Sequence, residues 1–334
     1  MKSLFKWCPL SPPSSYHAST RSTATGASIF AALSAIIIML FGLEQGLFLY
    51  LPLALSSFLF GLPHGAIDHL IIVGLARREM NLRTLTLACG VYLSLVILFF
   101  SLWWLNPMVG LILFLGITVY HWGKADLAFE SLIRTEALQN TPQFLKLSHL
   151  LLRGFLPIGT PFLAFPEATE SFIISCTSSF GQTFALNTSV STVISICLGI
   201  LLISEAFYLK SVGQHRTELA TEDIGLLVFF FLVPPLLAIG LYFCLWHSFR
   251  HVLRLVHYQP DRENNQLLLS RLGRFYRQAL PFTLASIMIV LAAVILLPEV
   301  KHADQLFGTY LVVISSLTLP HLCVVEWMDK RERI

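Results

Sequence analysis

Long apolar runs separated by short polar segments make up most of this chain. Most of the runs are close to the roughly 20 residues that a helix needs to cross a bilayer, and no alternating strand pattern competes with them. The pattern predicts an all-α fold, a polytopic transmembrane helix bundle with roughly eight to nine hydrophobic segments, some broken or re-entrant. We expect the spans at residues 27–43, 47–75, 84–105, 108–130, 148–165, 190–209, 225–256, 279–297 and 305–327.

The polar segments between the runs indicate an orientation, because cytoplasmic loops of membrane proteins are enriched in Lys and Arg. Loops with such residues alternate with a loop, 166–189, that has none. The alternation fails at loop 257–278, which is rich in arginine although simple counting places it outside. The preceding run, 225–256, is too long for one span and contains Pro234-Pro235, so we expect a broken or re-entrant segment there.

Composition supports a membrane protein. The chain is 55% hydrophobic and 12% charged, and a soluble domain carries about twice that charged fraction. The net charge of +3 is not gathered in a basic block, so nucleic acid is not an expected partner, and the six cysteines show no CxxC spacing that would indicate a disulfide or thiolate site. We expect a disordered polar tail over residues 1–26 and a single membrane domain over residues 27–330, in the cell inner (plasma) membrane.

Histidines carry the candidate chemistry. Of the 11 histidines, five lie in loops, tails or near span ends and are interpreted as ordinary polar residues: His17, His149, His215, His257 and His302. The others lie within or close to apolar runs, where ionisable side chains are costly and usually mark a site: His64, His69, His121, His247, His251 and His321.

The segment "WHSFRH" offers the sharpest pattern. His247 and His251 are four residues apart, so on a helix they lie on one face and can bind one metal ion. Arg254 extends the same face. The alternative is a pair of interior histidines hydrogen-bonded to neighbouring helices, and the apolar surroundings favour the metal.

The segment "GLPHGAIDHL" places His64 and Asp68 on one helical face. We assign His64 as a metal ligand and Asp68 as a residue that orients an imidazole. His69 points away from His64, and for it a site role and an ordinary buried role stay equal alternatives.

The segment "YHWGKAD" adds His121 as a ligand at a depth that His64 can share, with Asp126 as a supporting residue or an interface ion-pair partner. His321, in "TLPHLCVVE", is open as an extra ligand, a supporting base or a polar contact. Imidazole-rich sites suit zinc, copper, iron and nickel, and these residues alone do not choose among the four metals.

Taken in order, "PHGAIDH", "YHWGKAD", "WHSFRH" and "LPHLCVV" resemble the bacterioopsin-related Brp/Blh family of membrane-bound β-carotene 15,15'-dioxygenases. The resemblance spans residues 63–325. It implies central cleavage of β-carotene by O2 into two molecules of all-trans-retinal, in contact with membrane lipid, and delivery of retinal to a microbial rhodopsin. It also implies Fe(II) held by four histidines: His64, His121, His247 and His251.

Two other functions stay open. A histidine-box desaturase or hydroxylase usually carries HxxHH pairs, and this chain has one HxxxH and no HxxHH. A transporter with histidines in its pathway would also show broken spans. A retinal-binding rhodopsin is excluded, because residues 305–327 contain no lysine for a Schiff base.

Overall fold

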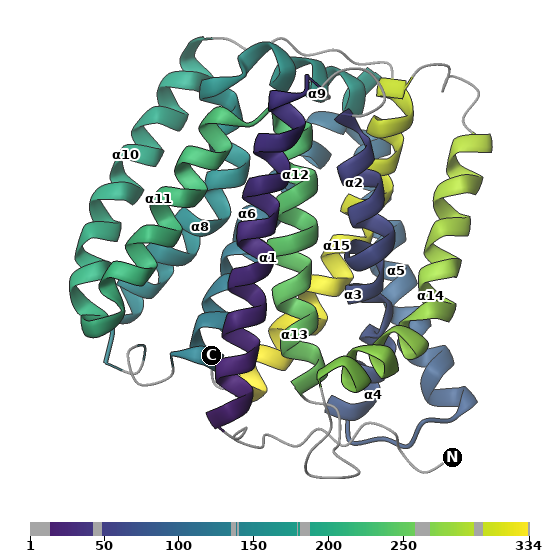
Figure 1. Ribbon diagram of the computed structural model, residues 1–334. Coiled ribbons are helices and arrows are strands. Elements are labelled where there is room, and N and C mark those ends of the chain that lie inside the picture. The colour runs from purple at the N-terminus through teal and green to yellow at the C-terminus, as the bar shows by residue number, and fades with distance from the viewer. Residues whose placement is uncertain are drawn as a thin grey trace.

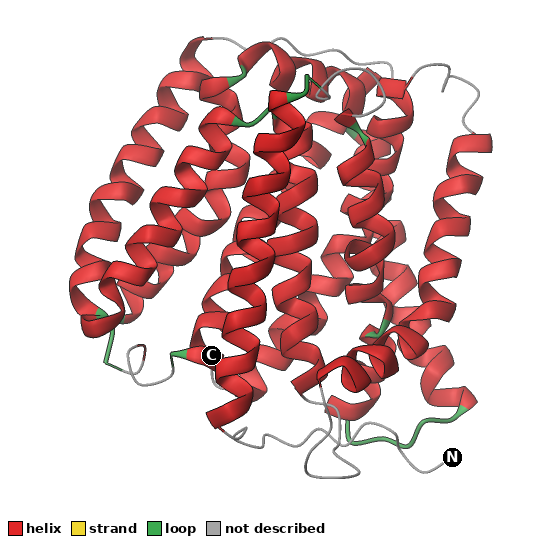
Figure 2. Cartoon of the chain, in the orientation of Figure 1, coloured by secondary structure: helices red, strands yellow, loops and turns green. Residues whose placement is uncertain are grey.

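Helices and short connections make up the described chain (Figures 1 and 2), and no strand occurs within it. The computed structural model describes residues 14–42, 49–134, 138, 140–178, 180, 188–257, 268–296 and 303–332. Eight stretches of helix are long and apolar enough to cross a membrane. The expected all-α, multi-pass bundle is confirmed.

Six of these stretches are continuous helices. They are α1 (Ser14–Leu40), α5 (Leu82–Leu105), α6 (Pro107–Ile133), α10 (Thr188–Ser211), α14 (Leu268–Leu296) and α15 (Ala303–Glu332). The other two stretches are built of pieces. One joins α2 (Leu51–Ser56), the π-helix η2 (Ser57–Gly61), α3 (Leu62–Ala66) and α4 (Asp68–Leu75), and the other joins α12 (Pro235–Tyr242), the π-helix η4 (Phe243–Ser248) and α13 (Phe249–His257).

Four further helical segments complete the described chain. They are α8 (Gln143–Ala164), α9 (Pro166–Ser178), the 3-10 turn η3 (Gly213–His215) and α11 (Arg216–Leu232). In Figure 1, α8, α10 and α11 lie together on one side of the bundle, α9 lies at its upper end, and α15 crosses its middle.

Two helices begin earlier than hydropathy indicates. Helix α1 begins at Ser14, so it includes part of the segment expected as a tail, while residues 1–13 lie outside the described chain. Helix α14 begins at Leu268 rather than near residue 279. Hydropathy placed the span later because several arginines in the first turns of the helix lower the mean hydropathy there. Hydropathy identifies only the apolar part of a helix, and the helix itself can extend beyond that part.

The long run 225–256 contains the end of α11 and most of the stretch formed by α12, η4 and α13. Helix α11 ends where Val233 adopts an extended backbone, with φ −96° and ψ 131°, because the residue before a proline avoids the helical region. Helix α12 then begins at Pro235, a position that needs no N–H donor. The two helices run in opposite directions (Figure 1), which restores the alternation that simple counting lost.

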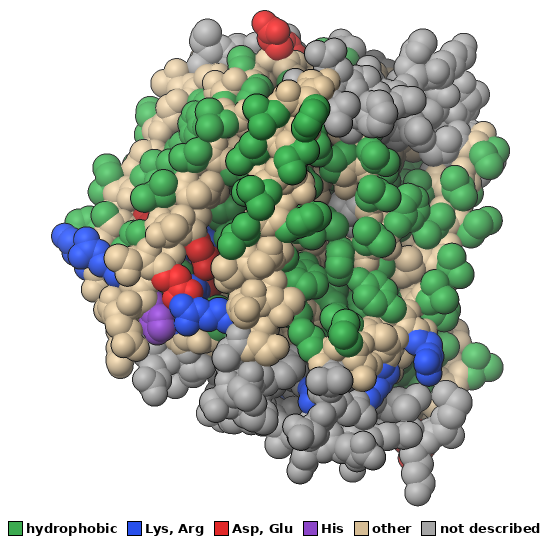
Figure 3. Space-filling model, viewed as in Figure 1, with side chains coloured by type: hydrophobic (Ala, Val, Ile, Leu, Met, Phe, Trp, Pro, Cys, Tyr) green, Lys and Arg blue, Asp and Glu red, His purple; other side chains and the backbone are tan. Residues whose placement is uncertain are grey.

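The basic residues now lie at one end of the bundle. Figure 3 shows hydrophobic side chains over its middle and the visible Lys and Arg side chains toward its lower part. The positive-inside rule predicts that such an end faces the cytoplasm.

Helices α6 and α8 are in backbone contact at two glycines. A Cβ added at Gly123 would lie 1.8 Å from the carbonyl oxygen of Leu150, and one added at Gly154 would lie 1.7 Å from that of Val119. Small residues allow membrane helices to approach closely. This contact fixes the depth and rotation of α6, which carries His121.

Candidate metal centre

Five imidazole rings meet inside the bundle and form what we name the histidine cluster. They belong to His64 on α3, His121 on α6, His247 on η4, His251 on α13 and His321 on α15. All five side chains are buried. Centroids of neighbouring rings are 4.7 to 5.7 Å apart. The fold therefore brings together residues that are up to 257 positions apart in the chain.

Many ring nitrogens of the histidine cluster have no hydrogen-bond partner in the described chain. Such buried atoms include both nitrogens of His247 and of His251, Nδ1 of His121 and Nε2 of His321. Buried polar atoms are normally paired, so these are free to coordinate. His64, His121 and His247 each offer a ligand atom, and these three atoms lie within 4.8 Å of one another. The arrangement can hold a metal ion.

Two π-helical segments position three of these rings. Segment η2 ends directly before α3, which carries His64, and segment η4 contains His247, one turn before His251. The two segments contact each other where Gly61 meets Phe243, since a Cβ at Gly61 would lie 2.4 Å from that aromatic ring. Short π segments are frequent at functional sites, and here a pair of them sets adjacent ligand-bearing turns against one another.

A large cavity adjoins the histidine cluster. Its volume is about 1150 Å³, beyond the roughly 300–1,000 Å³ of ordinary small-molecule pockets. His64, His121, His247 and His321 lie in its wall. Most of the remaining wall is apolar, with aromatic side chains that include Phe100, Phe114, Trp122, Phe162, Phe243 and Phe282.

Comparison with known proteins decides the family. The sequence profile of the β-carotene 15,15'-dioxygenase family matches residues 55–329. The chain belongs to this family.

Curated members of the β-carotene 15,15'-dioxygenase family match most of the chain. A probable β-carotene 15,15'-dioxygenase Blh of Halobacterium salinarum is 32% identical over 84% of this chain and 84% of its own. The β-carotene 15,15'-dioxygenase of uncultured marine bacterium 66A03 is 26% identical over 83% of this chain and 92% of its own. A probable β-carotene 15,15'-dioxygenase Brp of H. salinarum is 25% identical over 82% of this chain and 81% of its own. No solved structure matches the chain.

The part that matches the β-carotene 15,15'-dioxygenase family contains the whole histidine cluster. It also contains Asp68, whose Oδ2 accepts a hydrogen bond from Nδ1 of His321 at 2.8 Å. The imidazole that Asp68 contacts is that of His321 on α15, and not that of His64, with which its spacing places it on one helical face.

His69 lies outside the histidine cluster. Its Nδ1 is 3.0 Å from the carbonyl oxygen of Ala66, and its ring stacks on Phe282 with centroids 4.0 Å apart. His69 faces the cavity, but one nitrogen is engaged by backbone and the ring contacts an aromatic side chain.

Asp126 and Arg254 support the helices that carry the histidines. Asp126 accepts hydrogen bonds from Nε1 of Trp246 at 2.9 Å and from Arg250 at 3.1 Å, and these two donors each precede a histidine of the cluster by one residue. Arg254 forms a buried ion pair with Asp329. One contact ties α6 to the η4–α13 segment, and the other ties α13 to α15.

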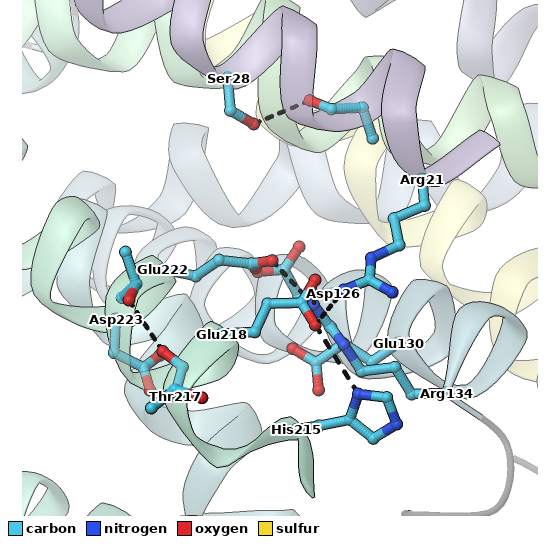
Figure 4. A network of polar contacts seen from close by, with 12 residues as sticks. Arg21, Ser28, Asp126, Glu130, Arg134, His215, Thr217, Glu218, Glu222 and Asp223 are labelled. Atoms are coloured by element: carbon cyan, nitrogen blue, oxygen red, sulfur yellow. Dashed lines mark hydrogen bonds and ion pairs between the residues drawn. The ribbon is translucent and has the colours of Figure 1, made fainter. Parts of the chain in front are cut away.

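Sequence reasoning missed a buried set of charged residues, here named the ion network. Figure 4 shows Asp126, Glu130 and Glu222 of this network near Arg134. Arg153 contacts four of its carboxylates, including Asp223 at 2.7 Å. Its buried or half-buried members are Asp126, Glu130, Arg134, His149, Arg153, Glu205, Glu222, Asp223 and Arg250. The sequence offered one signal of this network, which is Arg153 within the apolar run 148–165.

His149 is a member of this ion network, and its interpretation as an ordinary polar residue is wrong. The side chain is fully buried, with Nδ1 2.8 Å from Glu205 and Nε2 3.2 Å from Glu130. Its position near a span end concealed the two carboxylates that other helices bring to it.

Glu218 lies where the ion network reaches the bundle's end. Partial burial raises the pKa of Glu218, but hydrogen bonds from Arg134 and Arg21 outweigh this and hold the pKa below its usual value. The pair of arginines ties the start of α11 to α6 and α1.

Proposed function

We propose that this protein is an iron-dependent enzyme that cleaves β-carotene at its central double bond with O2 and forms two molecules of all-trans-retinal. His64, His121, His247 and His251 hold the Fe(II) ion in this proposal. The observation that carries it is a cluster of buried histidines in the wall of a large apolar cavity.

The residues present fit a bound metal. Neutral imidazoles are good ligands for iron as well as for zinc, copper and nickel, and the unpaired buried nitrogens of His121, His247 and His251 supply donors. The relatives' names describe dioxygenases. A bound metal that activates O2 must be able to change oxidation state, which favours iron over zinc. Bound iron would supply the activation of O2.

The cavity suits a lipophilic substrate. β-Carotene is wholly apolar and dissolves in the bilayer, so it can enter an apolar cavity without passing through water. Its halves are alike, so cleavage at the centre requires that the wall hold the middle double bond beside the histidine cluster. Burial of the cluster excludes bulk water and limits side reactions.

The overall reaction balances without another reductant. One double bond and one O2 give two aldehydes, with one oxygen atom in each. Retinal is itself apolar, so the product can remain in the membrane, where a microbial rhodopsin can take it up. We place the enzyme in the cell inner membrane, in contact with lipid.

A direct test uses the purified chain in detergent. The protein is stripped with a chelator, reloaded with Fe(II) and given O2 and β-carotene. We expect about one iron per chain and two retinal molecules per β-carotene consumed, measured by metal analysis and chromatography. His247→Ala, prepared in the same way, is the matched control and should form no retinal.

Other outcomes of this test would overturn the proposal. No retinal from iron-loaded wild-type protein would end the enzymatic function. Two metal ions per chain and a hydroxylated or desaturated carotenoid would favour the di-metal class. Uptake of a solute into vesicles, with β-carotene left intact, would favour a transporter.

A further inference from the structure

We propose that His321 is a fifth protein ligand of the ion held by the histidine cluster, with Asp68 fixing its tautomer. This inference rests on the proposed function, since it adds a ligand to the same site. It assigns to α15 a direct role in coordination, beyond the four histidines that the family resemblance implies.

The position of His321 within the cluster carries the first step. Its ring centroid lies 4.7 Å from that of His64, 5.1 Å from that of His121 and 5.5 Å from that of His251. His321 therefore contacts three of the other four rings, which belong to α3, α6 and α13. A histidine that served only helix packing would have no reason to lie at the centre of a group of ligands.

The two nitrogens of His321 have opposite surroundings. Nδ1 is 2.8 Å from Oδ2 of Asp68, whereas Nε2 is buried and has no hydrogen-bond partner. A carboxylate accepts, so Nδ1 carries the proton and the lone pair lies on Nε2. A metal-bound histidine typically has this arrangement, with its second nitrogen donating to a carboxylate.

His69 provides the contrast within the same cavity. Its Nδ1 bonds the carbonyl oxygen of Ala66, and its ring stacks on Phe282. Within the described chain, no carboxylate orients the His69 ring, and the ring contacts no ring of the histidine cluster. From the sequence, both His69 and His321 were open as additional site residues, and these surroundings favour His321 as the ligand.

With five imidazoles as ligands, a bound ion would have fewer open positions for small ligands than with four. Asp68 also brings a negative charge near an ion that neutral imidazoles leave uncompensated, which strengthens binding of a divalent metal.

The test measures metal binding rather than turnover. Purified wild-type protein, His321→Ala, Asp68→Asn, His69→Ala and His247→Ala are loaded with Co(II), whose visible spectrum reports coordination number, and affinity is measured by chelator competition. We expect affinity to fall at least 10-fold in His321→Ala and by a smaller factor in Asp68→Asn, since altered supporting residues typically cost 10–100-fold. The spectrum of His321→Ala should intensify toward that of a lower-coordinate ion, and added imidazole should restore the wild-type spectrum.

Controls separate this inference from the proposed function. His69→Ala should keep wild-type affinity and spectrum. His321→Ala that binds Co(II) as wild type does, while His247→Ala loses it, would overturn the fifth ligand and leave the four-histidine site standing. Wild-type protein that binds no metal would overturn the proposed function itself. If His321→Ala does not fold, His321→Asn is measured instead, and wild-type affinity in that variant would equally overturn the assignment.

Discussion

His247 and His251 lie on one stretch of chain, the first in a π turn and the second one turn later. In the described chain, the buried ring nitrogens of both residues have no hydrogen-bond partner. We predict that His247→Ala and His251→Ala each lose most bound iron and all measurable retinal formation, because each variant lacks one proposed metal-ligating nitrogen. Metal analysis and chromatography on the same samples check this, and a variant with full iron content would remove that residue from the ligand set.

Asp126 acts at the same scale through the residues that it holds. It binds Trp246 and Arg250, and Arg153 lies 3.3 Å away. Asp126→Asn keeps the shape but leaves two buried arginines without this charge, and removing one partner of a buried pair typically costs about 3–5 kcal/mol. We predict a clear loss of stability together with weaker metal binding.

Denaturant unfolding in detergent measures the effect of Asp126→Asn. Glu167→Gln, on the exposed part of α9, is the matched control and should change stability by no more than about 0.5 kcal/mol. An unchanged unfolding midpoint in Asp126→Asn would show that the remaining carboxylates of the ion network compensate fully.

The residues differ in how far their roles can be predicted from sequence. His247 and His251 are four apart on one element, and that spacing alone indicates a shared ligand face. Asp68 and His321 are 253 positions apart, and no periodicity states which imidazole a carboxylate will meet. Roles set within one helix are therefore readable from sequence, and roles set between helices require the fold.

Among the elements, the α6–α8 contact admits a sharp prediction. Gly123→Ala places a methyl group against the backbone of Leu150, and overpacking of this kind typically costs about 1–3 kcal/mol. The rigid backbone neighbour cannot rotate away, so α6 should shift and displace His121. We predict lower thermal stability and weaker metal binding, measured by unfolding and chelator competition.

Gly116 on the same helix is the matched control, because a Cβ there would meet nothing within 4 Å. Gly116→Ala should be neutral or slightly stabilising, by up to about 1 kcal/mol. Equal behaviour of the two variants would contradict the close contact between α6 and α8.

The elements were also predictable to different degrees. Spans such as α5 and α10 follow from apolar length alone. The separation of α11 from α12 could be anticipated only as an irregularity at Pro234-Pro235, because hydropathy does not distinguish a kink from a reversal. The π segments η2 and η4 were not predicted, since no spacing in the sequence marks their extra residue per turn.

At the scale of the whole molecule, the histidine cluster links five helical segments of the bundle. A ligand that binds only the folded state stabilises it, by about 2.7 kcal/mol at a hundredfold excess over Kd. We predict that removal of metal by a chelator lowers the Tm of the wild-type protein and that reloading restores it. His247→Ala should unfold at a temperature that does not respond to the chelator, and an equal response in both proteins would contradict a structural role for the metal.

Helix α15 is the last described helix along the chain, yet it crosses the middle of the bundle and packs on α4, α5, α6 and α9. During synthesis the earlier helices enter the membrane before α15, so their contacts with α15 form only after it arrives. Until then, Asp68 lacks its histidine and Trp103 lacks Ser315, the acceptor of its indole N–H. These contacts thus depend on the arrival of α15, and a chain arrested before it would leave polar groups without their partners, a feature that quality-control proteases can recognise.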